Sequence, residues 1–281
     1  MVVMDATWPL LLALVTAANE VETAVAVHLP TFKDLLAILA PRASDGDCTI
    51  LAEGFTEEEQ ESFLKQHNEF RSIIATGKAE KFPKAAAMNF LEWNKALARK
   101  AQNTAQFCDP SRQGKEEDLK KTDEDYEGGT SQNTGSIFIN KAEEAAQKGF
   151  AILQNWFKAR EKFDVAGLDK YVKQADADVE RFAQLIWAKS VRIGCGYVKF
   201  SLKSQPDADP EEILVCNYNP AGRVEGQPVY EKGEPCTKCE DRLCNEETQL
   251  CRNKFDETKE RKLGGDDAGA LMGMVGIAAA V

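Results

Sequence analysis

Two β-rich runs with one cysteine in each constrain this chain more than any other feature. The runs are Ile193 to Leu202 and Ile213 to Tyr218, and both favour extended backbone. Between them lies SQPDADPEE, whose prolines and aspartates suit a hairpin loop rather than a continuing strand. The two runs therefore predict adjacent strands. Cys195 and Cys216 are then close enough for a disulfide bond if the register brings them opposite each other.

A short amphipathic helix is predicted directly before the first run. Val179, Phe182, Ala183 and Ile186 have spacings of i, i+3, i+4 and i+7, which place them on one helical face. Asp178 is the candidate N-cap, because its carboxylate can accept from the unpaired N–H groups of a first turn. A helix followed by a hairpin is therefore the predicted centre of the fold.

This order of segments resembles the two signature motifs of the CAP superfamily, which contains cysteine-rich secretory proteins, antigen 5 and pathogenesis-related proteins. The helix carries a Gln-apolar-apolar-Trp core, the first strand reads IGCGY, and the second reads VCNYNPAG. The residues that carry the resemblance here are Gln184, Trp187, Gly194, Cys195, Gly196, Cys216, Asn217, Tyr218 and Pro220. The resemblance implies an α+β fold, a three-layer α-β-α sandwich with a small cysteine-rich C-terminal hinge.

A first core helix is predicted after Thr56, which forms a capping box with Glu59. Its apolar face contains Phe63, Leu64, His67, Phe70 and Ile74. The segment looks like the opening of venom antigen 5 proteins, which have a His-Asn-x-x-Arg motif on their first core helix. That motif is His67, Asn68 and Arg71 here. A lone histidine on an apolar face is usually a core residue, so we interpret His67 as structural rather than as a ligand.

A second helix is predicted after Asn94, the candidate cap. Its buried side contains Leu97, Ala98, Ala101, Ala105 and Cys108. This segment also matches the family. Cys48 and Cys108 occupy positions that pair in antigen 5 relatives, so the resemblance implies a disulfide bond between them.

Charge and cysteine content narrow the functional classes. Acidic residues number 46 against 35 basic residues, so the net charge of -11 gives a nucleic-acid partner no electrostatic support. Eight cysteines, four of them between Cys236 and Cys251, fit an oxidising compartment better than the cytosol. Zinc is the alternative for those four, because Cys236-Thr-Lys-Cys239 is a C-x-x-C motif. Cys244 and Cys251 are too widely spaced for a ribbon-like site, so we favour disulfides.

The segment after Gly222 looks like the hinge module that follows the CAP domain in cysteine-rich secretory proteins. That resemblance implies the pairs Cys236–Cys244 and Cys239–Cys251. The family's ion-channel regulatory module has six more cysteines, and this chain has none left for it. Channel blocking of that type is therefore not expected. A 281-residue chain suits one domain with extensions as well as two domains, and we place the CAP domain at residues 52–224 and the hinge at 225–252.

The two ends of the chain carry apolar stretches. Residues 1–18 have an apolar core and small residues at a cleavage position, which favours a signal peptide, although the start lacks Lys and Arg; a structural helix is the alternative. Residues 19–51 are expected to be an N-terminal extension. The tail, residues 253–281, ends in an apolar stretch too short to span a bilayer. A GPI anchor is an alternative there, but the polar spacer is nearly absent, so we favour a plain tail and a secreted, extracellular protein.

The middle of the chain is predicted to contain one loop and one long helix. From Asp109 to Asn140 the chain is too polar to bury a core face, so we expect an exposed loop; a calcium site lacks the D-x-D-x-D-G order. Asn140 is the candidate cap of the helix. Its apolar positions are Ala145, Gly149, Ile152, Leu153, Trp156 and Phe163.

Many CAP domains carry two histidines and two glutamates around a central cleft, a set that can hold a divalent metal. By the family pattern these four positions fall on Arg112, Ser136, Ala159 and Arg181. The chain has two histidines, His28 and His67, and neither matches. Two arginines at the site would repel a cation. We therefore expect no zinc in this cleft and no cofactor.

These observations predict a secreted CAP protein that binds without catalysis. The chain has no G-x-S-x-G, P-loop or G-x-G-x-x-G motif, and every cysteine has a plausible disulfide partner. The family implies a sterol, a fatty acid, another lipid or a protein receptor as ligand. A metal-assisted hydrolase is disfavoured by the missing cleft residues, and a scaffold that displays the acidic segment Gln113 to Asn133 is a third hypothesis. The family pattern also breaks at Arg223, where many members have an asparagine.

Overall fold

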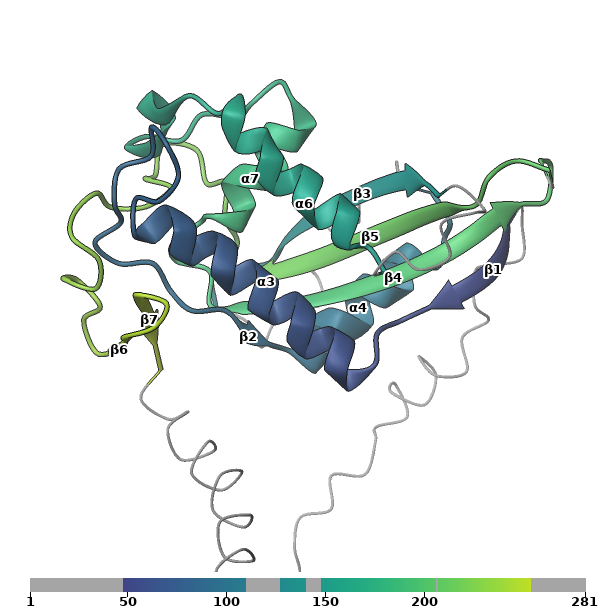
Figure 1. Cartoon of the computed structure of the whole chain (residues 1–281), viewed down its shortest axis with the longest axis horizontal. Coiled ribbons are helices and arrows are strands. Elements are labelled where there is room, and N and C mark those ends of the chain that lie inside the picture. The colour runs from purple at the N-terminus through teal and green to yellow at the C-terminus, as the bar shows by residue number, and fades with distance from the viewer. Residues whose placement is uncertain (1–47, 110–126, 140–147, 206, 254–281) are drawn as a thin grey trace, which may run out of the picture. The chain divides into compact units, whose positions relative to one another are not determined.

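An antiparallel hairpin of two long strands is the centre of the fold (Figure 1). Strand β4 (Arg192–Leu202) pairs with β5 (Glu211–Asn219), and the register places Cys195 opposite Cys216. The two cysteines form a disulfide bond with 4.1 Å between their Cα atoms. The hairpin predicted from the two β-rich runs is therefore confirmed. This computed structural model describes residues 48–109, 127–139, 148–205 and 207–253 of the chain.

Two further strands extend the hairpin into a sheet of order β1-β4-β5-β3. Strand β1 (Cys48–Glu53) pairs antiparallel with β4, and β3 (Ser131–Phe138) pairs antiparallel with β5. The short β2 (Glu92–Trp93) runs parallel to β4. The sheet thus begins at Cys48, so residues 48–51 belong to it and not to an N-terminal extension.

Strand β3 corrects the expectation of an exposed loop from Asp109 to Asn140. Residues 131–134 are buried although all four are polar. Each of the four side chains forms a hydrogen bond inside the fold; for example, Gln132 Nε2 donates to Asn217 Oδ1 over 2.9 Å. The Oδ1 atom of Asn133 is the one buried side-chain polar atom of these four residues without a partner among the described residues. The last residues of the predicted display segment, up to Asn133, are therefore part of the sheet, and residues 110–126 lie outside the described residues.

Helices cover both faces of the sheet, which gives the three-layer α-β-α sandwich that the resemblance implied (Figure 1). Helix α4 (Lys95–Ala105) packs on one face against Val198, Phe200, Ile213 and Val215. The other face is covered by α3 (Glu57–Ala75), α6 (Phe150–Lys158) and α7 (Ala177–Leu185), together with short 3-10 turns at Ala159–Glu161 and Val165–Leu168. The larger part of the core lies on this side.

The helix ends show which caps could be predicted from neighbouring residues alone. The capping box of Thr56 and Glu59 and the Asn94 cap are both present. The α7 prediction was wrong by two residues, because Asp176 caps the helix and accepts from the N–H of Asp178. Helix α6 has Gly149 as its N-cap and ends at Lys158, so Phe163 lies beyond it; Asn140 falls outside the described residues.

The C-terminal module contains a small two-stranded sheet, β6 (Leu243–Asn245) and β7 (Leu250–Arg252). Disulfide bonds join Cys236 to Cys244 and Cys239 to Cys251, and a fourth joins Cys48 to Cys108. These three bonds have the pairing that the resemblance implied, and Cys195–Cys216 is the pair predicted from the two β-rich runs. Backbone hydrogen bonds attach the module to residues 84–90, including one from the N–H of Cys251 to the carbonyl of Met88 over 2.8 Å. Among the described residues, no helix combines the length and apolar character that crossing a membrane requires.

Two signature glycines allow α4 to lie directly on β4. A Cβ atom built on Gly194 would be 2.1 Å from the backbone nitrogen of Ala98, and one on Gly196 would be 2.2 Å from that of Gln102. Backbone atoms cannot move aside as a flexible side chain can. The side chain of Gln102 also forms two hydrogen bonds with the backbone of Tyr197, which fixes the helix over the strand.

Replacement of Gly196 by alanine is therefore expected to lower the free energy of unfolding by at least about 2 kcal/mol, because α4 must shift away from the sheet. Gly167→Ala is the matched control: its nearest neighbouring atom is 3.8 Å from the new Cβ, and we expect a change within about 1 kcal/mol. Urea unfolding followed by circular dichroism measures both. Equal losses in the two variants would contradict the close packing of α4 on β4.

Candidate functional site

A cleft of about 590 Å³ opens between β3, α6, the 3-10 turn that follows it and the first turns of α7. Its apolar wall contains Ile137, Ile152, Trp156 and Ala159. Gly135 makes this wall possible, because a Cβ atom there would be 2.7 Å from Ile152 Cγ2 and 2.8 Å from Trp156 Nε1. Strand β3 and helix α6 are thus in contact at the base of the cleft.

Charged side chains surround the apolar wall. The cations are Lys158, Lys162 and Arg181, and the carboxylates are Glu161 and Asp178. Arg181 Nη1 donates to Asp178 Oδ1 over 2.6 Å. Lys162 pairs with Asp176 over 2.8 Å, a hydrogen bond that raises the pKa of the lysine. No ion pair of Lys158 is found among the described residues.

The structure brings three of the four predicted cleft positions together. Ser136, Ala159 and Arg181 all line this cleft, whereas Arg112 lies outside the described residues. Imidazole and carboxylate groups are good ligands for a divalent metal, whereas the methyl group of Ala159 and the guanidinium of Arg181 offer no lone pair and Ser136 offers only a neutral hydroxyl. Asp178, a remaining carboxylate, is already held by Arg181. These residues do not fit a metal ion.

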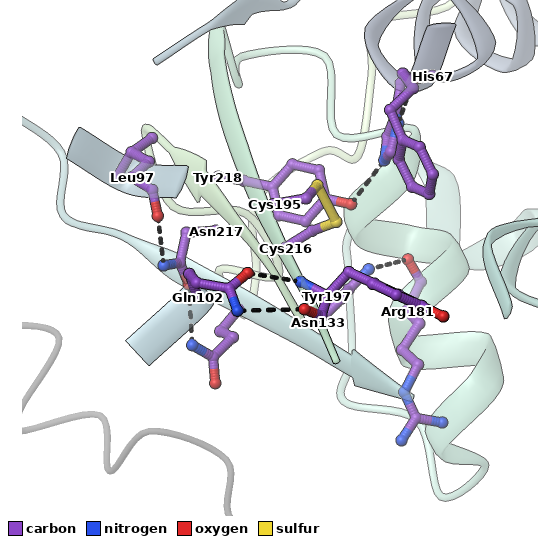
Figure 2. The surroundings of a disulfide bond; sticks show 12 residues. His67, Leu97, Gln102, Asn133, Arg181, Cys195, Tyr197, Cys216, Asn217 and Tyr218 are labelled. Atoms are coloured by element: carbon purple, nitrogen blue, oxygen red, sulfur yellow. Dashed lines mark hydrogen bonds between the residues drawn. A yellow bond between two sulfur atoms is a disulfide. The ribbon is translucent and has the colours of Figure 1, made fainter. Parts of the chain in front are cut away.

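One cluster of three potential metal-ligating side chains does occur in the described part of the chain, at His67, Cys195 and Cys216 (Figure 2). Its two sulfurs are bonded to each other. His67 Nδ1 lies 2.8 Å from the carbonyl oxygen of Phe63, so this nitrogen is the donor, and Nε2 accepts from the hydroxyl of Tyr218 over 3.1 Å. Both ring nitrogens are therefore occupied, which supports the structural interpretation of His67.

The other signature side chains also bind backbone or one another. Asn68 donates to the carbonyl of Leu91 and accepts from its N–H, at 3.0 and 2.8 Å. Gln184 Oε1 accepts from Ser131 and from the N–H of Gly222. Asn217 Nδ2 donates to the carbonyl of Leu97 over 3.1 Å. These residues hold the strands and helices together and leave the chemistry of the cleft to its own lining.

A second, smaller pocket was not foreseen. It measures about 240 Å³ and lies between β3 and the segment that precedes α7. Arg181 lines both pockets, and Lys173 and Arg223 line this one. The sequence contained one signal for it, namely Arg223 in place of the family's asparagine.

Comparisons with known proteins agree with this architecture. The family model "CAP: Cysteine-rich secretory protein family" matches residues 64–218. Scoloptoxin SSD43 of Scolopendra dehaani is 30% identical over 205 residues, which are 73% of this chain and 90% of that protein. Venom allergen 5 of Polybia scutellaris rioplatensis is 33% identical over 190 residues, 66% of this chain and 84% of the relative. The crystal structure of NaASP2 with Zn²⁺ has a TM-score of 0.55 at 28% identity and covers 70% of this chain and 97% of its own.

Protonation of His67 is expected to destabilise the fold. Burial, together with the smaller effect of the nearby charge of Arg71, lowers the pKa of His67 from 6.5 to about 4. The unfolded chain therefore binds more protons than the folded chain between pH 4 and pH 6.5, so stability is complete above this window and falls as pH falls through it. The loss from His67 is about 3 kcal/mol. In urea unfolding, the stability difference between the natural chain and His67→Gln should narrow towards pH 4; a constant difference would refute this assignment.

The cleft is expected not to bind zinc. Isothermal titration with Zn²⁺ should show no saturable binding to the natural chain. A triple variant that restores ligands, Ser136→Glu, Ala159→Glu and Arg181→His, is the positive control and should bind Zn²⁺ saturably, because it supplies two carboxylates and an imidazole in place of a neutral hydroxyl, a methyl group and a guanidinium. Stoichiometric zinc in the natural chain would show that the cleft retains a metal site.

Proposed function

Because the chain belongs to the cysteine-rich secretory protein family, we propose that it is an extracellular binding protein that acts without catalysis and holds a fatty acid in the cleft beside β3. The observation that carries this proposal is the pairing of an apolar wall with Lys158 and Arg181 in one cavity of about 590 Å³, whose charged lining contains three cations and two carboxylates. A volume of this size is typical of small-molecule sites. A fatty acid has the matching distribution of an apolar chain and a single carboxylate.

The two parts of the ligand would use different residues. The hydrocarbon chain would lie along Ile137, Ile152 and Trp156, where removal of apolar surface from water supplies the affinity. The carboxylate would accept from Lys158 and from Arg181, whose planar guanidinium can bind both carboxylate oxygens. A sterol has no charge to match these cations, so a fatty acid is the better fit within the lipids that the family binds.

The extracellular location is supported by the disulfide bonds. Four bonds cross-link the described residues, and disulfides persist in oxidising compartments but are rare in the cytosol. The relatives named above include venom proteins. A role in binding rather than catalysis is supported by the cleft itself, where an alanine and an arginine occupy positions that hold metal ligands in other family members.

Titration with palmitate below its micellar concentration tests the proposal. We expect saturable binding, and we expect palmitate methyl ester and cholesterol to bind at least about tenfold more weakly, since neither carries the charge that Lys158 and Arg181 bind. Lys158→Gln and Arg181→Gln should each weaken palmitate about three- to tenfold. Lys78→Gln, an exposed site away from the cleft, is the matched control and should leave the affinity unchanged.

Two results would overturn the fatty-acid proposal. One is the absence of saturable palmitate binding, and the other is equal affinity of the natural chain and both cleft variants. Binding of a receptor protein by a chain that takes up no lipid would favour the receptor alternative.

A further inference from the structure

The second pocket, formed by β3, the segment that precedes α7 and the turn after β5, has a strong excess of positive charge. Lys173, Arg181 and Arg223 line it, and Glu180 is the one carboxylate in its lining. That carboxylate is already engaged, because Glu180 Oε1 accepts from the hydroxyl of Tyr171 and from the N–H of Gln174. The pocket therefore has three cations and one acid that is committed to other partners.

Arg223 is placed with donors to spare. Its Nη2 donates to the backbone carbonyl of Gln132 over 2.9 Å, and no other hydrogen bond of its guanidinium is found among the described residues. Burial lowers the pKa of Arg223, because its charged form loses hydration that its hydrogen bond to Gln132 does not fully replace. The negative charge of the nearby Glu180 partly opposes this lowering of the pKa. A guanidinium has five N–H donors, so most of its capacity remains for a partner in the pocket.

The backbone of Arg223 is also in a conformation that arginine rarely adopts. Its φ angle is +58°, in the left-handed region that glycine and asparagine tolerate best. An arginine there costs about 1 kcal/mol relative to those residues. Five other described non-glycine residues also have positive φ angles, so this conformation agrees with a functional role for the guanidinium but does not by itself indicate one.

Lys173 completes the cationic wall. It is exposed, and the described part of the chain contains no ion pair of its ammonium group. Two backbone hydrogen bonds, Tyr171 N–H to Gln227 and Gly226 N–H to Tyr171, tie the Lys173 segment to the Arg223 segment. The segments that carry Lys173 and Arg223 are therefore held side by side by backbone hydrogen bonds.

Asn133 fixes the backbone of Arg181, the third cation of the pocket. Its side-chain Nδ2 donates to the backbone carbonyl of Arg181 over 3.0 Å, as Figure 2 shows. This bond connects β3 to α7 at the residue whose guanidinium lines the pocket. The side chain of Arg181 pairs with Asp178, which leaves Lys173 and Arg223 as the two cations without a carboxylate hydrogen-bonded to them among the described residues.

We propose that this pocket binds a phosphate group, either as free inorganic phosphate or a small phosphomonoester, or as the phosphomonoester headgroup of a lipid. A phosphate has more acceptor oxygens and more charge than a carboxylate, and two guanidinium groups with an ammonium group match it. A volume of about 240 Å³ suits a small headgroup. Val172 and Val224, which are 59% and 38% exposed, flank Lys173 and Arg223 in the chain and would face a membrane interface if the source is a lipid.

The site is tested by titrating the chain with inorganic phosphate and with glycerol phosphate while the amide chemical shifts are measured by NMR. We expect saturable shifts at residues of the pocket. Arg223→Asn should weaken binding at least about tenfold and Lys173→Gln about threefold, while Lys78→Gln, with the same charge change as Lys173→Gln but at a distant exposed site, should have no effect. Asparagine tolerates the left-handed backbone, so Arg223→Asn should keep the unfolding temperature of the natural chain.

Vesicles distinguish the two sources of phosphate. If the source is a lipid, the chain should bind phosphatidylcholine vesicles that contain phosphatidic acid, not those of phosphatidylcholine alone, and Arg223→Asn should abolish this binding. Binding of the soluble phosphates alone supports the free-phosphate source. The proposal is overturned if the natural chain shows no saturable chemical-shift changes. It is also overturned if Arg223→Asn binds phosphate as tightly as the natural chain, or if Lys78→Gln weakens phosphate binding. Arg223 does not line the fatty-acid cleft, so palmitate affinity should be the same in Arg223→Asn and the natural chain. Loss of phosphate binding with unchanged palmitate binding then separates the two sites, which share Arg181.

Discussion

A buried arginine without an ion-pair partner among the described residues holds the two halves of this fold together. Arg71, on α3, is fully buried, and its guanidinium donates to five backbone carbonyls. The acceptors are Asn89, Leu185, Trp187, Ala188 and Ser190. Four of them lie between the last residue of α7 and the start of β4. The carbonyls of Trp187 and Ala188 also accept from backbone N–H groups, those of Ser190 and Asn89. Buried carbonyls without donors would each cost about 1–3 kcal/mol, so the guanidinium stabilises this turn chiefly through Leu185 and Ser190.

The hydrogen bonds of Arg71 show why the family signature contains many residues that position the backbone and do not line a pocket. Arg71 fixes α7 relative to α3, and Gln184 then connects α7 to Ser131 on β3 and to Gly222 after β5. Arg181 belongs to the same short helix, so its position in the cleft follows from these bonds. The scaffold therefore specifies where residue 181 stands, and its side chain alone decides which ligand is favoured there.

The parts of the fold that could be predicted from the sequence are those with local signals. The caps at Thr56 and Asn94 and the β-rich hairpin depend on neighbouring residues, and the structure contains them. Strand β3 could not be predicted in this way, because its polar residues are buried only through partners far along the chain, such as Asn217 for Gln132. Residues 173 and 223 are 50 positions apart in the sequence, so no local pattern could bring them into one pocket.

We infer that the replacement of metal ligands would favour an anionic ligand rather than close the cleft. Ser136 and Ala159 are smaller than the side chains they replace and carry no negative charge, while Arg181 adds a positive one. Its partner Asp178 does not cancel this effect, because the carboxylate is 50% exposed and an exposed pair contributes only about 0–1 kcal/mol. An anion that arrives from solvent can compete with such a pair, since it also gains from Lys158. Since Arg181 lines both pockets, its positive charge would contribute to both of the proposed anion sites.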